Sequence, residues 1–515
     1  MSGPDDVVQV KRLDTPASLR ARLAQLGADL PVDDLVDPGP GGALAQPLTV
    51  PLPGGDRTVA NRFTILPMEG WDGTADGRPT ELVRRRWRRF GRSGAAVVWG
   101  GEAVAVTADG RANPNQLWFG PEAEGDLASL RDEVVAGHVE AMAALEAAGV
   151  DPAVIGSAGG SGAGGAASPL LGLQLTHSGR WARPEGVPAP RTAYRHPVLD
   201  DRVGAGDEAV LSDAELDDLV AAFVRAAQVA AAAGFDFVDV KQCHGYLGHE
   251  LLSAVDRAGP YGGDLDGRTR FVRSVIAGIR SAAPSLGLGV RLSLFDIAPH
   301  AAGPDGVGVA QIAAGSTSYP YAFGGDGTGA GIDLTEVHAL VDRLVDGGVT
   351  MLCATASSPY YAPHAQRPAF FPPSDGYLPP RDPLVDVAVL QGVTAQVSAA
   401  HPQVVVVGSG LTYVQDWFAH VAQPLVAGGW FDSAGLGRMV LSYPTLPLDV
   451  LAGRALDRRA VCRTFSDCTT APRQGLVSGC YPLDPFYKER PERVELTRAK
   501  RAAEAARGGR RRSAR

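Results

Sequence analysis

The chain is poor in cysteine, in aromatic residues and in long apolar runs. Five cysteines among 515 residues are too few for a disulfide framework, which indicates a reducing, cytoplasmic compartment. No stretch reaches the roughly 18 apolar residues of a membrane span, and residues 1–20 hold no apolar run of the signal-peptide kind. The formal net charge of -9 argues against nucleic acid. We therefore expect a small-molecule substrate, no membrane and no nucleic-acid partner, and the oligomeric state stays open, a homo-oligomer included.

Glycine and proline, by contrast, are abundant. The chain has 64 Gly and 39 Pro, with 45% hydrophobic and 20% charged residues, which favours an α/β protein with many turns between short elements. The pattern divides the chain into an N-terminal helix (17–30) and linker over 1–47, a main domain over 48–450, a cysteine-containing extension over 451–488 and a basic tail over 489–515. We expect the tail to be disordered.

Eight short apolar runs in the main domain end in polar or glycine residues. They predict strands at 63–66, 95–99, 171–175, 235–241, 288–293, 350–353, 403–407 and 433–436. Helical patterns such as 216–233, 268–281 and 334–346 separate most of them. A doubly wound open sheet alternates in the same way, but the strand count and the polar strand ends favour a (β/α)8 TIM barrel. The runs 48–50 and 58–60 predict a hairpin that caps the barrel bottom.

Two segments are too rich in small residues for regular barrel elements. Residues 156–168 are nearly all Gly, Ala and Ser, and residues 298–331 are glycine-rich with Tyr319 and Tyr321 embedded. We expect both to form long surface loops, the second with the composition of a lid.

The fourth predicted strand ends in side chains that carry out chemistry. Lys241, Cys243, His244 and Tyr246 follow it closely, and residues at the carboxyl end of a barrel strand project into the active site. Gln174 also lies late in its strand. Arg291 has the alternative of a salt bridge at the barrel bottom, but Leu292 and Ser293 follow it and place it in the C-terminal half of its strand.

Glycines follow the last two predicted strands. Gly408-Ser409-Gly410 and Gly437-Arg438 would place backbone N–H groups and a guanidinium where barrels commonly bind a phosphate. Either cluster alone has the alternative of ordinary turn glycines. Their placement on consecutive strands favours a phosphate site.

A set of motifs follows in order along the main domain. They are Pro67-Met68, Leu173-Gln174-Leu175-x-His177-x-Gly179-Arg180, His244-Gly245-Tyr246-Leu247 with Leu252-Ser253, Tyr261-Gly262-Gly263 and Gly437-Arg438. Together, over roughly residues 45 to 445, they resemble the Old Yellow Enzyme family of FMN-dependent oxidoreductases. The resemblance implies FMN at the barrel mouth near Pro67, Met68, Glu69, Gly101, Gln174, Arg291, Gly408, Gly410, Gly437 and Arg438. Gln174 would face the flavin's pyrimidine edge, and Arg291 would stabilise negative charge on the reduced ring.

The resemblance also implies a reaction. NAD(P)H would reduce FMN, the reduced flavin would deliver hydride to the β-carbon of an activated alkene, and Tyr246 would protonate the α-carbon. Lys241 and His244 would hold the carbonyl oxygen, where enolate charge develops. No G-x-G-x-x-G motif follows a strand in 461–515, so NAD(P)H would bind directly over FMN.

Two positions depart from the family pattern. Lys241 stands where the family usually has histidine, and its charge favours a substrate carboxylate, a fuller enolate charge or the anionic reduced flavin. Pairing of Lys241 with Glu69 or Glu102 is the alternative. Glu69 stands where the family often has Thr or Cys, and a carboxylate near flavin O4 would disfavour flavin reduction unless a cation such as Lys241 neutralises it.

Three cysteines follow the predicted barrel. Cys462, Cys468 and Cys480 lie where the multidomain branch of the family holds a four-cysteine iron–sulfur cluster. The second position of that motif is Phe465 here, and the remaining two cysteines fall on barrel strands, so the ligand set is one thiolate short. We predict no cluster and no other metal.

The sequence thus predicts an FMN-dependent oxidoreductase that uses NAD(P)H to reduce an activated C=C bond of a small molecule. An FMN-dependent dehydrogenase that oxidises a substrate C–H or C–N bond is the enzyme alternative. A degenerate barrel that serves as an interaction module is the non-enzyme alternative.

Overall fold

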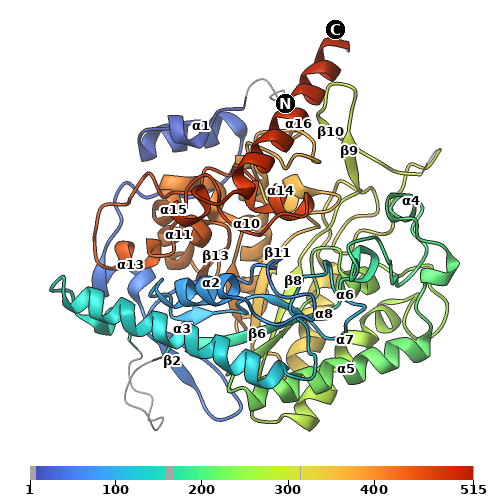
Figure 1. The fold of residues 1–515 in the computed structure, drawn as a ribbon, viewed down its shortest axis with the longest axis horizontal. Coiled ribbons are helices and arrows are strands. Elements are labelled where there is room, and N and C mark those ends of the chain that lie inside the picture. Colours follow the sequence, from blue (N-terminus) through green and yellow to red (C-terminus); the bar gives the residue numbers. More distant parts are fainter. Residues whose placement is uncertain (1–6, 157–167, 314, 514–515) are drawn as a thin grey trace.

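Eight parallel strands close into a barrel at the centre of the molecule (Figure 1). The computed structural model describes residues 7–156, 168–313 and 315–513. In barrel order the strands are β3 (Phe63–Ile65), β4 (Val97–Val98), β6 (Leu170–Thr176), β7 (Phe237–Val240), β8 (Gly287–Ser293), β11 (Met351–Thr355), β12 (Val405–Gly408) and β13 (Ser433–Leu436). The barrel closes because β13 pairs with β3 and β4 pairs with β6. The predicted (β/α)8 barrel and its eight strands are confirmed.

The strands are short and almost wholly buried, as their continuous apolar runs require. A further strand, β5 (Ala103–Ala105), follows β4 and pairs with the upper part of β6, so that two consecutive segments of chain share one neighbour. This offset carries the loop after β4 around the barrel mouth.

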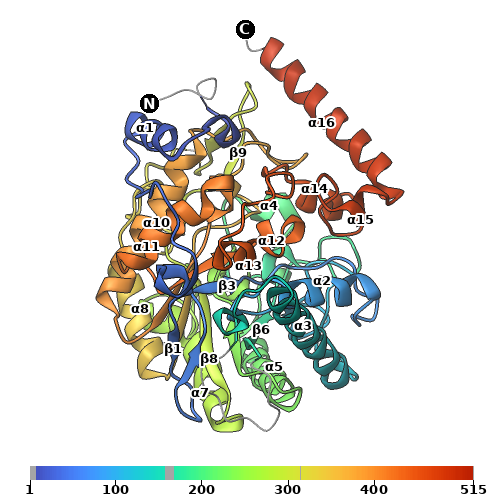
Figure 2. The same ribbon diagram turned by 90° about the vertical axis from the view of Figure 1, so that its left-hand side faces the viewer.

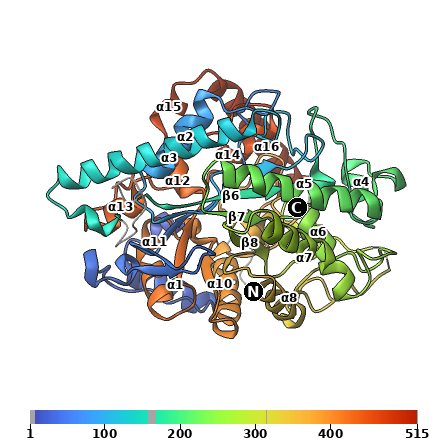
Figure 3. The same cartoon turned by 90° about the horizontal axis from the view of Figure 1, so that it is seen from below.

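Helices surround the strands, as the view from below shows (Figure 3). The longer ones are α2 (Glu81–Gly91), α3 (Ala123–Glu146), α5 (Asp213–Ala232), α7 (Leu265–Ala282), α8 (Thr335–Asp346), α10 (Pro383–Ala400) and α11 (Phe418–Ala427). The predicted helices at 216–233, 268–281 and 334–346 correspond to α5, α7 and α8. In α5 the side chain of Ser212 accepts a hydrogen bond from the N–H of Glu215, whose own side chain returns to the Ser212 N–H, and this capping box fixes the start of the helix. Only α10, among the described helices, is long and apolar enough to cross a membrane, and more than half of it is buried in the protein.

Short elements complete the mouth and the N-terminus. They are α1 (Pro16–Leu26), α4 (Asp200–Val203), α6 (Leu247–Leu252), α9 (Pro363–Gln366), α12 (Met439–Ser442) and α13 (Leu446–Leu451). The predicted N-terminal helix is thus present as α1, four residues shorter at its C-terminal end than expected, because Gly27 adopts a left-handed conformation there.

The predicted hairpin closes the lower end of the barrel. Strands β1 (Leu48–Val50) and β2 (Arg57–Val59) pair antiparallel. The guanidinium of Arg57 donates to Asp236 Oδ1 at 2.8 Å and to the Ser168 carbonyl at 2.8 Å, just before β7 and β6 begin. These contacts place the hairpin under the amino ends of the strands, and the opposite end is left to the loops that form the cleft.

The structure describes nearly all of only one of the two predicted loops. Residues 157–167, most of the first, lie outside the described residues. The second segment contains a small antiparallel hairpin of β9 (His300–Ala302) and β10 (Gly308–Ala310). Tyr319 in this segment is 3% exposed, and its hydroxyl bonds His196 at 2.8 Å. This part of the segment is therefore packed against the body of the protein.

The C-terminal part of the chain folds over the barrel mouth. It carries α14 (Asp467–Arg473), α15 (Pro485–Lys488) and α16 (Glu492–Ser513), at the end of the molecule opposite β1 (Figure 2). We expected a disordered tail over 489–515, but residues 492–513 form α16. Its first turns are held because Leu496 packs with Ala471 and Tyr481, and Lys500 forms an ion pair with Asp467 at 2.5 Å.

Gly172 on β6 has no room for a side chain. A Cβ atom there would lie 2.2 Å from the ring of Phe237 and 2.4 Å from the carbonyl oxygen of Trp99. The carbonyl oxygen belongs to the backbone, so it cannot give way without a shift of the chain. We expect Gly172→Ala to lower the free energy of unfolding by about 1–3 kcal/mol, measured by chemical denaturation followed by circular dichroism. The matched control is Gly392→Ala in α10, where a Cβ atom meets nothing within 4 Å and the helix gains up to about 1 kcal/mol. Equal stabilities of the two variants would contradict this packing.

Candidate active site

A deep cleft lies at the carboxyl ends of the strands. It encloses about 1160 Å³, open solvent included, between the strand-end loops and α14 of the C-terminal extension. Most of the residues predicted from the sequence line it, namely Pro67, Met68, Glu69, Gln174, Lys241, His244, Tyr246, Arg291, Gly410, Gly437 and Arg438. The barrel therefore brings residues at the ends of six different strands to one place.

The loop after β7 presents three of these side chains. His244 and Gly245 have φ angles of 67° and 74°, so two consecutive residues are left-handed. The position of Gly245 needs glycine, because a Cβ atom there would lie 2.8 Å from Ser358 Oγ and from the ring of Tyr361. His244 carries a side chain in the same unfavourable region, a kind of strain that is frequent at functional sites. The turn ends at Tyr246, which begins α6.

Tyr246 is buried and donates its hydroxyl proton to a carboxylate. Its O–H bonds Glu69 Oε2, and its oxygen lies 3.0 Å from the hydroxyl of Tyr360. Burial, with the Glu69 charge next, raises the pKa of Tyr246 well above its ordinary value. Tyr246 is therefore a neutral phenol whose proton, in this arrangement, points to Glu69.

Lys241 lies against the same tyrosine. Its ammonium is 3.6 Å from the ring centroid of Tyr246, a cation–π contact. Burial lowers the pKa of Lys241. Of the two acids expected as partners, Glu102 is held by Arg86 and by Trp87 Nε1 at 3.2 Å, and Glu69 is taken by Tyr246. Within the described part of the chain no ion pair joins Lys241 to an acid, so its charge faces the cleft.

His244 is a neutral imidazole. Burial, then Arg291 and Lys241, lower its pKa well below the ordinary value. His244 Nε2 lies 3.0 Å from the side-chain amide nitrogen of Gln366 and 3.3 Å from Thr355 Oγ1. With the Gln366 amide in this orientation, Nε2 accepts and Nδ1 carries the single ring proton, which makes His244 a hydrogen-bond donor without a charge.

A buried carboxylate organises the floor of the cleft. Asp239 on β7 accepts from Trp99 Nε1 at 2.8 Å, from Gln174 Nε2 at 2.6 Å and from the Arg291 backbone N–H at 2.6 Å. Burial raises the pKa of Asp239 to about 6 against the effect of these donors. Because Gln174 Nε2 gives one of its two hydrogens to Asp239, its carbonyl oxygen and one N–H are left for a ligand. The Nε atom of Arg291 is buried without a hydrogen-bond partner in the described structure.

The far end of the cleft is strongly basic. Arg438 donates to the Pro368 carbonyl at 2.9 Å, and its Nη1 atom is buried without a partner among the described residues. Arg367 and Arg473 line the same cleft. Gly410, with a φ angle of 84°, begins the turn after β12 and exposes backbone at this end. Such a group of donors suits a phosphate or another anion.

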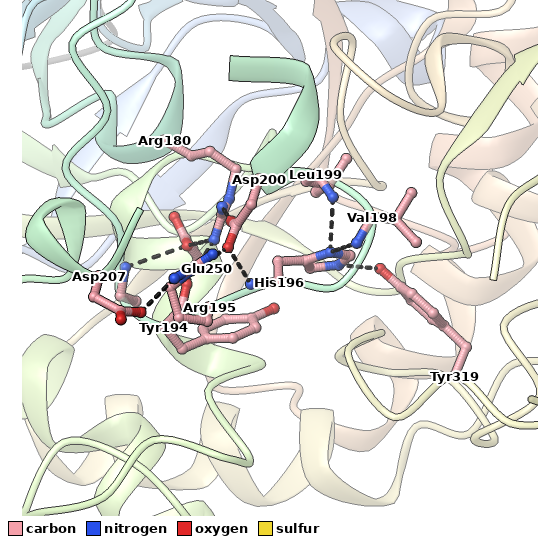
Figure 4. A network of polar contacts seen from close by, with 11 residues as sticks. Arg180, Tyr194, Arg195, His196, Val198, Leu199, Asp200, Asp207, Glu250 and Tyr319 are labelled. Atoms are coloured by element: carbon pink, nitrogen blue, oxygen red, sulfur yellow. Dashed lines mark hydrogen bonds and ion pairs between the residues drawn. The ribbon is translucent and has the colours of Figure 1, made fainter. Parts of the chain in front are cut away.

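A second polar network surrounds Arg180 (Figure 4).

 Arg180, after β6, forms ion pairs with Asp200 and with Glu250 on α6, and donates to the Tyr194 carbonyl at 2.8 Å. His196 bonds Tyr319 of the 298–331 segment. The network ties α6, and with it the Tyr246 turn, to the neighbouring loops.

The sequence located the strand-end residues and missed those from elsewhere. Gly101 and Gly408, both predicted near the cofactor, are not among the residues that line the cleft: Gly101 packs against Trp87, and Gly408 against Phe431. Cys243 is buried as part of the core. The lining residues that sequence reasoning missed include Tyr360, Gln366, Arg367, Thr469 and Arg473. They lie on the loop after β11 and on α14, where no strand end marks them.

The three cysteines of the extension lie near one another. Cys468 lines the cleft, and burial raises the pKa of Cys462 and of Cys480. Phe465 stacks on Phe371 with ring centroids 5.4 Å apart, so packing takes the position of the missing fourth ligand. In the part of the chain that the structure describes, no group of three or more His, Cys, Asp or Glu side chains could hold a metal ion.

The predicted lack of an iron–sulfur cluster can be measured directly. We expect anaerobically purified protein to contain less than one iron per chain and a visible spectrum of flavin alone, because three thiolates leave a [4Fe–4S] cluster one ligand short. Iron analysis of the same sample as the spectrum checks this. About four irons per chain, with broad absorption beyond the flavin bands, would show that another group completes the ligand set.

The chain is similar to known flavin oxidoreductases in sequence. Residues 166–313 match the model of the NADH:flavin oxidoreductase / NADH oxidase family. The NADPH dehydrogenase of Halalkalibacterium halodurans is 28% identical over 229 residues, which is 44% of this chain and 56% of that protein. The NADPH dehydrogenase of Bacillus subtilis is 29% identical over 239 residues, 45% of this chain and 60% of that protein. The chain thus spans less than two thirds of the length of these relatives.

Solved structures share the fold. A 2-naphthoyl-CoA reductase in complex with 2-naphthoyl-CoA aligns with a TM-score of 0.60 and 14% identity, over 88% of this chain and 58% of that chain. The Old Yellow Enzyme homologue of Zymomonas mobilis aligns with a TM-score of 0.51 and 17% identity, over 79% of this chain and 91% of that chain. With the family match, these likenesses confirm the predicted resemblance to the Old Yellow Enzyme family.

Proposed function

Because this chain resembles the Old Yellow Enzyme family in fold and in sequence, we propose that it is an FMN-dependent oxidoreductase that uses NAD(P)H to reduce an activated C=C bond. The observation that carries the proposal is the grouping of Tyr246, His244 and Lys241 over a floor made by Gln174 and Arg291 in one cleft. A phenol can supply a proton, and a neutral donor with a cation can stabilise developing enolate charge.

The cleft fits FMN on its own chemistry. Its floor offers the carbonyl oxygen of Gln174 as an acceptor and the unpartnered Nε of buried Arg291 as a donor. Its far end offers the unpartnered Nη1 of Arg438 beside the turn at Gly410. A planar heterocycle with polar edges and a terminal phosphate matches these two ends. FMN, when bound, supplies a ring that accepts and returns a hydride.

Two residues would hold the substrate carbonyl. His244 donates from Nδ1 without a charge, and Lys241 adds a positive charge where enolate charge develops. Burial removes water from the Lys241 ammonium and thereby lowers its pKa. A weakly solvated cation of this kind interacts strongly with a bound anion. Together they favour a carbonyl whose oxygen becomes fully anionic.

Tyr246 would supply the proton to the substrate carbon. Its hydroxyl is neutral at ordinary pH, since burial and Glu69 raise its pKa, so it carries a proton to give. Tyr360, 3.0 Å away, can donate to the Tyr246 oxygen and stabilise the phenolate that proton transfer leaves. For this step the Tyr246 O–H would have to turn from Glu69 to the substrate.

The reverse kind of chemistry has one observation in its favour. The Tyr246 proton points to a carboxylate, an acceptor, as a base that removes a proton from a substrate would require. An FMN-dependent dehydrogenase, which oxidises a C–H or C–N bond, is therefore the second candidate.

The proposed reaction is tested by activity and by one substitution. We expect alkene-dependent oxidation of NAD(P)H by the wild-type enzyme, and we expect Tyr246→Phe to slow the alkene half-reaction by about 10²–10⁴-fold, the usual contribution of a general acid. Flavin reduction by NAD(P)H should change little, since no substrate carbon is protonated in it. Stopped-flow absorbance separates the two half-reactions. Equal losses in both would remove Tyr246 from the acid role.

Substitution of Glu69 distinguishes the two directions. In alkene reduction Glu69 only competes for the Tyr246 proton, so Glu69→Gln should keep the rate of that half-reaction within about tenfold. A dehydrogenase would lose about 10²–10⁴-fold, because glutamine cannot take up the proton. Flavin bleaching by candidate substrates alone measures the second reaction, and Glu69→Asp, which keeps the carboxylate, is the control. A large loss of alkene reduction in Glu69→Gln, restored in Glu69→Asp, would contradict the assignment of direction.

A further inference from the structure

The cleft contains more positive charge than one phosphate can satisfy. We propose that Arg367 and Arg473 form a second anion subsite, which binds a phosphate or carboxylate group carried by the substrate or by the hydride donor. This inference rests on the proposed function for the identity of the ligand, and on the geometry of the two arginines for the existence of the subsite.

Arg367 is the central observation. Its Nη1 atom donates to Thr469 Oγ1, while its Nε and Nη2 atoms are buried and have no hydrogen-bond partner in the described structure. A guanidinium with two unsatisfied buried donors is costly unless a ligand binds them. Arg367 lines the cleft, so a turn of its guanidinium would present these donors to a ligand there.

The surrounding charges make the cost larger. Burial, followed by the charges of Arg438 and Arg473, lowers the pKa of Arg367 to about 9. It still carries its charge at neutral pH. Within this group Arg473 pairs with Asp375 at 2.8 Å, and Asp375 is half exposed. Three guanidinium groups beside one solvated carboxylate favour the binding of anions between them.

The subsite adjoins the predicted phosphate site but is built from other elements of the fold. Arg438, with Gly410 and Gly437, follows the last two barrel strands. Arg367 follows α9, and Arg473 ends α14 in the extension. If the cofactor phosphate binds at the strand ends, its contacts satisfy Arg438, and the fork formed by Arg367 and Arg473 is left for a different anion.

The subsite lies beside the reacting groups. The Arg473 guanidinium is 5.6 Å from the ring centroid of Tyr360 and donates to the Pro359 carbonyl at 3.1 Å. The hydroxyl of Tyr360 is in turn 3.0 Å from that of Tyr246. Gln366, next to Arg367, contacts His244. An anionic group held here therefore belongs to the molecule whose other end reaches Tyr246 and His244, which gives the site a preference for charged over neutral ligands.

A binding experiment tests the subsite independently of turnover. The FMN-loaded enzyme, in which the cofactor phosphate is already in place, is titrated with inorganic phosphate, and binding is followed by the absorbance of the flavin. We expect Arg367→Gln and Arg473→Gln each to raise the phosphate dissociation constant at least tenfold. Arg367→Lys should give an intermediate value, because it keeps the charge and loses the fork. The control is Arg459→Gln, an exposed arginine that does not line the cleft, which should bind as the wild type does.

Steady-state kinetics identify which molecule carries the anion. A KM for NADPH that rises in Arg473→Gln, with the KM for NADH unchanged, assigns the subsite to the hydride donor. A KM that rises for an enone bearing a carboxylate, and not for the matched neutral enone, assigns it to the substrate. Unchanged phosphate binding in Arg367→Gln and Arg473→Gln would contradict the subsite. Loss of bound FMN from these variants, with phosphate binding unchanged, would contradict it as well. Alkene reduction that is absent while phosphate binding depends on both arginines would remove the proposed reaction and keep the subsite.

Discussion

The cleft depends on one carboxylate at the centre of the barrel. Asp239 accepts hydrogen bonds from Trp99, Gln174 and the backbone of Arg291, which come from three neighbouring positions around the barrel. It thereby fixes the height of each strand end relative to the others. A buried acid with these donors but without a contact ion pair is expensive to ionise, and its raised pKa, about 6, reflects that cost. The floor on which a ligand would lie is thus set by a polar group and not by apolar packing.

Above that floor, groups of opposite charge surround the tyrosines of the cleft. Glu69 bonds Tyr246 and Lys241 packs on its ring, while Arg473 lies against Tyr360. Since the walls are buried, these charges are weakly screened and act over longer distances than they would in water. A ligand with a polar reacting group at one end and an anionic group at the other would be oriented before it made close contact.

The sequence predicted the barrel because apolar runs and the residues that end them are local features. The eight strands, the bottom hairpin and the side chains at strand ends follow from such runs, and the residues at Lys241, His244 and Tyr246 were found for that reason. Arg367 and Arg473 could not be found in this way. They lie on a short helix and in the extension, and only tertiary folding brings them together, over about a hundred residues of chain. Asp239 lies within a predicted strand, but its role could not be predicted, because the groups that donate hydrogen bonds to it come from other strands.

The position of α14 along the chain has a consequence for assembly. The barrel strands end at Leu436, whereas one wall of the cleft is built from residues 468–473. During synthesis the barrel can close before this wall has left the ribosome, since domains fold as their segments emerge. A cofactor could therefore enter through an open mouth, which the extension then narrows. Docking of the extension would trap the cofactor, so release would require local unfolding of a short helix and not of the barrel.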